Sequence, residues 1–268
     1  MSTMTGSTTS AARLTNLERI LLLIPTAGGA IFGLFPLLAP VAFATAAGGT
    51  GDDAYIYRVA GAATLGYAVA LVYALLDGGW DRARLVVIAT LTFNAASLFA
   101  CAVTLVSKPS QAVVWLIFVT SLIIVTITAR MLYSHRGDPR PTPDTGAWLF
   151  GFLAVATPVA ALFGLIPLFA PTEFGHWFGF KATDVFTFRQ AAAAVLGYGA
   201  LGVFELRSRA WAEIRSAAVM AGTFNALAAI VSIIALANGE RSPLALIVAI
   251  AAGVVALVTI VEFVRRGR

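Results

Sequence analysis

The stretch GLFPLLAP at residues 33–40 occurs a second time in this chain, as GLIPLFAP at residues 164–171. The two copies lie 131 residues apart, from 33 to 164, and further matches keep that spacing without a gap. These matches pair Asp53 with Asp184, Arg58 with Arg189, Gly66-Tyr67 with Gly197-Tyr198, Trp80 with Trp211, and Thr92-Phe93-Asn94 with Thr223-Phe224-Asn225. Apolar sequences often match by chance in Leu, Ala and Val, but rarely in Pro, Arg, Trp and Asn at one fixed spacing. The chain is therefore predicted to be a tandem duplication.

The composition predicts a membrane protein. Of 268 residues, 59% are hydrophobic and only 12% are charged, whereas soluble domains carry about 25% charged residues. A membrane span needs about 20 apolar residues, so eight spans would use about 160 residues and leave about 100 for loops. One cysteine and two histidines argue against a disulfide scaffold and against a histidine-ligated metal or haem site. We therefore expect no cofactor and no metal.

Eight apolar runs are long enough to span a bilayer. They cover residues 19–44, 58–76, 85–106, 112–132, 147–170, 189–205, 216–237 and 243–264. Strands of a membrane barrel would alternate polar and apolar residues, and these runs do not. The predicted fold is an all-α integral membrane protein with eight transmembrane helices in two four-helix repeats.

The basic residues predict how the repeats are oriented. Thirteen of the 18 Lys and Arg residues fall on the side of both termini and five on the other side, and cytoplasmic loops are enriched in Lys and Arg. Both termini are therefore predicted to lie in the cytoplasm, with the protein in a bacterial inner membrane. Because each repeat has an even number of spans, the repeats should be parallel, related by a pseudo-two-fold axis along the membrane normal.

The same reasoning divides the chain into five segments. They are a cytoplasmic amino-terminal tail (1–17), the first repeat (18–133), a cytoplasmic linker (134–146), the second repeat (147–264) and a short cytoplasmic tail (265–268).

The first candidate site residues are Arg58 and Arg189, at the outer ends of the second and sixth spans. One interpretation is structural: each arginine reaches towards the membrane surface and forms an ion pair with Asp53 or Asp184, five residues upstream. The other is functional: the two guanidinium groups face each other across the pseudo-two-fold axis and bind an anionic group. The sequence leaves both interpretations open.

The second candidates are Tyr67 with Asn94 and their copies, Tyr198 with Asn225. At about 1.5 Å per residue, both members of each pair should reach the middle of the membrane. An amide there needs a hydrogen-bond partner, because lipid provides none. We expect a Tyr–Asn hydrogen bond within each repeat, which either joins helices or lines a substrate cavity.

Small residues and prolines also recur in both halves. The spacings Ala62-xxx-Gly66 and Ala193-xxx-Gly197 predict close helix contacts. Prolines recur in the first and fifth spans, at Pro25, Pro36, Pro40, Pro158, Pro167 and Pro171. They either interrupt helices around a transport site or end those helices near the membrane surface.

A four-helix unit with Pro36-x-x-x-Pro40 closing its first helix and Arg58-x-x-Gly61-Ala62 opening its second resembles the DoxX-like group of small bacterial membrane proteins. The resemblance lies in hydropathy plan and length, and it implies no particular activity.

Three classes of function remain open. The first is a carrier or channel-like binder of a small anionic or amphipathic molecule at the interface between the repeats. The second is a non-catalytic accessory subunit of a larger membrane complex. The third, a membrane enzyme acting on lipid or quinone, is disfavoured because few acids, bases or nucleophiles lie near the spans, and we expect no catalytic residue. The expected partners are the lipid bilayer, bound lipid, other membrane subunits or a second copy of the chain, and no nucleic acid.

Overall fold

The computed structural model describes residues 12–266, and this part of the chain forms ten α-helices. Their bounds are α1 (Asn16–Leu38), α2 (Pro40–Ala46), α3 (Ala54–Asp77), α4 (Trp80–Ser107), α5 (Ala112–Ser134), α6 (Ala147–Phe169), α7 (Pro171–Trp177), α8 (Val185–Ser208), α9 (Trp211–Ala237) and α10 (Pro243–Arg266). Below, α1–α5 are called the first half and α6–α10 the second half. The two predicted tails, 1–17 and 265–268, lie partly outside the described residues.

Seven of these helices are long and apolar enough to cross a membrane, namely α1, α3, α4, α5, α6, α9 and α10. The chain is therefore an all-helical protein of the polytopic membrane type. The exception among the long helices is α8. It has 24 residues, but Arg189, Gln190 and Glu205 lower its hydropathy.

The apolar run predicted at 19–44 is two helices instead of one. α1 ends at Leu38 and α2 begins at Pro40, and Ala39 between them leaves the helical conformation, with φ −131° and ψ 63°. A proline has no amide hydrogen to donate and disfavours helical geometry in the residue before it. The same break occurs at Pro171. These two prolines end a long helix and start a short one, whereas Pro25, Pro36, Pro158 and Pro167 lie inside helices.

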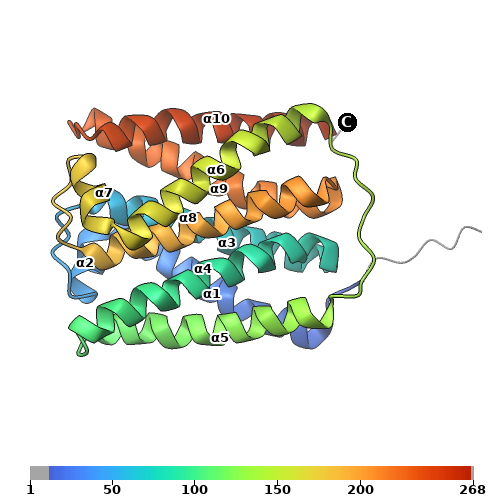
Figure 1. Ribbon diagram of the computed structural model, residues 1–268, viewed down its shortest axis with the longest axis horizontal. Coiled ribbons are helices and arrows are strands. Elements are labelled where there is room, and N and C mark those ends of the chain that lie inside the picture. Colours follow the sequence, from blue (N-terminus) through green and yellow to red (C-terminus); the bar gives the residue numbers. More distant parts are fainter. Residues whose placement is uncertain (1–11, 267–268) are drawn as a thin grey trace, which may run out of the picture.

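The long helices run roughly parallel to one another along the length of the molecule (Figure 1). The linker and the C-terminus lie at one end, and α2 and α7 lie at the other. We call these the linker end and the short-helix end. α3, α4, α8 and α9 form the centre: α4 packs mainly on α8 and α3 mainly on α9, so the main central contacts join the two halves. The outer helices α1, α5, α6 and α10 pack on α3, α4, α8 and α9 respectively.

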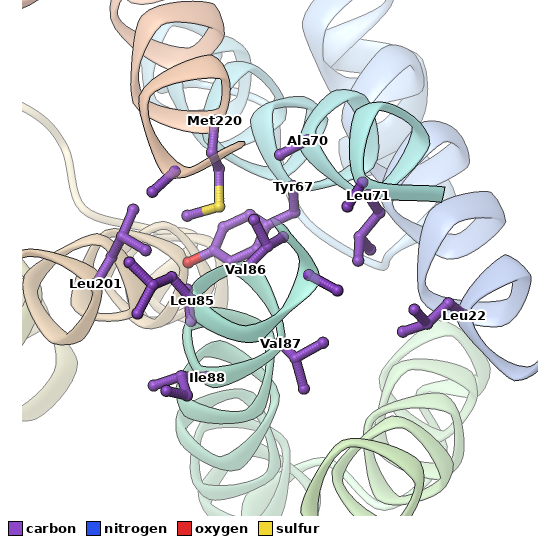
Figure 2. Close-up of a cluster of buried hydrophobic side chains, with 14 of the residues drawn as sticks. Leu22, Tyr67, Ala70, Leu71, Leu85, Val86, Val87, Ile88, Leu201 and Met220 are labelled. Carbon is purple, nitrogen blue, oxygen red and sulfur yellow. The ribbon is translucent and has the colours of Figure 1, made fainter. Parts of the chain in front are cut away.

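The largest buried cluster lies between these central helices. It includes Leu71 of α3, Leu85 and Val86 of α4, Leu201 of α8 and Met220 of α9 (Figure 2). The outer helices instead present large apolar side chains on the surface, among them Leu38, Val155 and Ile250. Water would penalise such a surface, whereas hydrocarbon does not.

Candidate functional site

Two buried carboxylates tie the halves together at the short-helix end. Asp53 accepts hydrogen bonds from the backbone amides of Lys181 (3.1 Å) and Ala182 (2.9 Å). Asp184 accepts from the backbone amides of Thr50 and Gly51, both at 2.8 Å. Each aspartate thus holds the loop that precedes the other. Burial raises the pKa of Asp53, and these two backbone hydrogen bonds act in the opposite direction.

The predicted ion pairs of Asp53 with Arg58 and of Asp184 with Arg189 are therefore wrong. Within residues 12–266, neither arginine has a carboxylate oxygen within ion-pair distance. The carboxylates turn away from their own helices because the amides of the opposite loop would otherwise be buried without a hydrogen-bond acceptor. Sequence spacing could not show this, since the partners lie more than 120 residues away.

Both arginines are half-buried at the starts of α3 and α8. The Arg189 Nε donates to the carbonyl of Leu168, at the end of α6, over 3.3 Å. The structure thus gives Arg189 a backbone acceptor, and neither Arg58 nor Arg189 lines one of the two cavities described below.

At the centre of the molecule, Tyr67 and Tyr198 form a symmetric pair. The Tyr67 hydroxyl donates to the carbonyl of Ala194 (2.6 Å), and the Tyr198 hydroxyl donates to the carbonyl of Ala63 (2.8 Å). The ring centroids are 5.2 Å apart in an edge-on arrangement. Figure 2 shows the Tyr67 hydroxyl directed towards the helix of Leu201, which is α8. The predicted Tyr–Asn bond within each repeat is thus wrong: each tyrosine bonds to the opposite half.

The two asparagines satisfy one amide hydrogen within their own helices. The Asn94 Nδ2 donates to the carbonyl of Thr90, and the Asn225 Nδ2 donates to that of Ala221, both over 2.8 Å. Their remaining polar atoms lie on cavity walls, because Asn94 lines a cavity in the first half and Asn225 lines one in the second.

These two cavities differ greatly in size. The first has a volume of about 90 Å³ and lies among α1, α3, α4, α5 and the start of α8. Its wall is partly polar, with Thr64, Thr90, Ser97, Ser121 and Gln190. The second has a volume of about 480 Å³, lies among α6, α8, α9 and α10, and is mostly apolar. The space between the halves is filled by the tyrosine pair, so the cavities lie within the halves.

The second cavity contains a residue that the sequence interpretation missed. Glu205, in the last turn of α8, lines the cavity and is only 6% exposed. From the sequence it looked like a charge at the end of a span, in contact with water. The signal was available in the duplication: 131 residues earlier stands Ala74, and Leu71 stands in place of Gly202. The second half thus exchanged a leucine and an alanine for a glycine and a carboxylate on one helix face.

Another pair joins the halves at the linker end. The Arg84 Nη1 contacts both carboxylate oxygens of Glu213, at 2.7 and 2.9 Å. The Glu213 side chain is 1% exposed and that of Arg84 is 12% exposed. Such a buried ion pair is a structural element, since both charges are satisfied by each other.

In chemical terms, the arrangement is suited to binding. Within residues 12–266, no cluster of three or more His, Cys, Asp or Glu side chains could hold a metal ion. Cys101 is buried, and burial keeps a thiol unreactive. Comparison of the chain with protein-family models, with curated proteins and with solved structures finds no match.

Proposed function

We propose that the chain crosses the membrane eight times, as two parallel four-helix repeats related by a two-fold axis along the membrane normal. The helix order supports this, because α6, α7 and α8 each begin 131 residues after α1, α2 and α3. The exchanged contacts of Tyr67 with Tyr198 and of Asp53 with Asp184 also relate the halves as a two-fold axis would. With α8 in the centre of the bundle, its polar residues face protein and its low hydropathy is tolerated.

The basic residues place both termini in the cytoplasm of this proposed topology. We expect Ser134→Cys, at the end of α5, to resist a membrane-impermeant thiol reagent applied to intact cells. Ser110→Cys, in the α4–α5 loop, should react, and both residues are exposed. A Cys101→Ala background removes the only native cysteine. Labelling of residue 134 from outside would contradict the orientation.

We further propose that the protein binds, and as a carrier moves, an amphipathic small molecule in the cavity between α6 and α10. The observation that supports this is the cavity itself: about 480 Å³, walled by apolar side chains. Ligand sites usually measure about 300–1,000 Å³ and combine apolar walls with a few polar groups. The site lies within the second half, because Tyr67 and Tyr198 occupy the interface between the repeats.

Ala156→Phe tests this proposal by filling the cavity. Ala156 lies on the cavity wall of α6, and a phenyl ring would take up much of the space that a ligand needs. We expect the amount of small molecule that co-purifies per protein to fall about tenfold, which corresponds to about 1.4 kcal/mol of lost binding. Solvent extraction followed by mass spectrometry measures it.

Ala154→Phe is the matched control, because Ala154 lies on the same helix but is exposed and does not line the cavity. It should keep the bound molecule. Equal small-molecule content in both variants, together with a second membrane protein that elutes in fixed ratio, would favour the accessory-subunit alternative instead.

A further inference from the structure

The Glu205 carboxylate occupies a defined place on the cavity wall. Tyr198, Leu201, Gly202 and Glu205 all line the cavity from one face of α8. Seven residues separate Tyr198 from Glu205, so the carboxylate lies about 10 Å further along the helix, towards the linker end. The cavity thus has a long apolar part and a single acidic group near one end of α8.

No side chain of the protein neutralises this carboxylate. Among residues 12–266, Glu205 has no ion-pair or side-chain hydrogen-bond partner. The two arginines that follow it are directed elsewhere: Arg207 lies over the ring of Phe204, and Arg209 lies over the ring of Phe150.

The other two buried glutamates at this end do have partners. Glu262, which also lines the cavity, is held by Arg265 at 2.9 Å and by Arg266 at 3.2 Å. Glu213 is held by Arg84. Glu205 therefore stands apart as an acid that is buried and left for something outside the chain.

A second polar group of the cavity is also without a partner. The Thr157 hydroxyl of α6 is buried and makes no hydrogen bond within the described chain. It faces Gly202, about one turn of α8 before Glu205, and lines the same cavity. An unsatisfied buried hydroxyl and an unpaired buried carboxylate each cost free energy, which a bound polar head group would recover.

We propose that the cavity binds an amphipathic cation, with an ammonium-type head group at Glu205 and an apolar body between α6 and α10. This inference rests on the proposed function and adds the charge of the ligand to it. A carboxylate buried among apolar side chains is stabilised most by an opposite charge. An anionic amphiphile would meet repulsion at the same place, and a neutral one would leave the carboxylate unpaired.

The first half provides an internal comparison. It has Ala74 and Leu71 at the positions that match Glu205 and Gly202, and its cavity measures only about 90 Å³. The first half therefore has neither the acid nor the room. One cation should bind per chain, in the second half.

Three probes with the same C14 chain test the inference: tetradecyltrimethylammonium, tetradecanol and tetradecanoate. Binding of each radiolabelled probe to the purified full-length protein is measured by equilibrium dialysis in detergent. We expect the ammonium to bind most tightly. Glu205→Gln should weaken its binding about tenfold or more, the equivalent of about 1.4 kcal/mol, and should change tetradecanol binding less than about twofold. Glu173→Gln, an exposed glutamate in α7, is the matched control and should change neither.

The possible outcomes separate the two proposals. If tetradecanol binds, is displaced by Ala156→Phe, and the ammonium binds no more tightly, the cavity is a binding site and the cation inference is wrong. If no probe binds, or if Ala156→Phe changes nothing, the proposed function itself fails. Thermal unfolding of Glu205→Gln should match that of the wild type. If it does not, Glu205→Asp, which keeps the charge, should retain the preference for the ammonium over the alcohol, and loss of that preference would also overturn the inference.

Discussion

Replacing Glu213 with alanine should destabilise the protein by about 3–5 kcal/mol, the usual cost of removing one partner from a buried ion pair. The Arg84 guanidinium would then be left with 12% exposure and without the two carboxylate contacts at 2.7 and 2.9 Å. Because Arg84 lies on α4 and Glu213 on α9, the loss should loosen the contact between the two halves. Thermal unfolding of the purified protein, compared with wild type in the same detergent, measures the effect.

The double variant Arg84→Met with Glu213→Met distinguishes charge from shape. With both charges gone and similar volume kept, most of the lost stability should return. As a control, Asp52→Ala breaks the exposed pair of Asp52 with Lys181, whose side chain is 69% exposed, and should cost less than about 1 kcal/mol. A double variant as unstable as the sum of its single changes would show that the pair contributes something other than mutual neutralisation.

Gly197→Ala should be the next most damaging change, with a loss of about 1–3 kcal/mol from overpacking. A Cβ at this position would overlap the Tyr67 hydroxyl and lie 2.8 Å from the carbonyl oxygen of Ala89. The tyrosine cannot move away without giving up its bond to the carbonyl of Ala194. Thermal unfolding should again show the loss.

A second substitution tests the cause of this loss. Tyr67→Phe removes the hydroxyl, so it should recover part of the stability lost in Gly197→Ala, although alone it costs about 1 kcal/mol through the lost hydrogen bond. Gly253→Ala, within α10, is the matched control: a Cβ there meets nothing within 4 Å, and alanine should be neutral or slightly stabilising. If the Tyr67→Phe change and the glycine change add without any recovery, the hydroxyl contact is not the reason that glycine is required.

Much of the fold could be predicted from the sequence because its causes are local. Hydropathy located the long helices, since each apolar run must keep its backbone hydrogen bonds within itself in a bilayer. The duplication predicted which positions would match, and Tyr67 with Tyr198 do form equivalent contacts. The break at Pro40 could be predicted only as an alternative, because a proline can lie inside a helix or start a new one.

Which residues touch each other was decided by the tertiary structure. Asp53 and Asp184 were assigned to the nearest arginines, but the folded chain brings the loop of the opposite half closer to each. Tyr67 was paired with Asn94 by depth in the membrane, whereas the main central contacts, α4 with α8 and α3 with α9, join the two halves.

The sequence by itself determined the class of this protein and its helical, duplicated plan, because composition and period are properties of consecutive residues. Only the tertiary structure decided where a ligand could bind. The cavity of about 480 Å³ and the unpaired carboxylate of Glu205 arise from α6, α8, α9 and α10 together. An empty volume depends on how far apart four helices pack and on which faces they turn inward, and no single apolar run encodes that spacing.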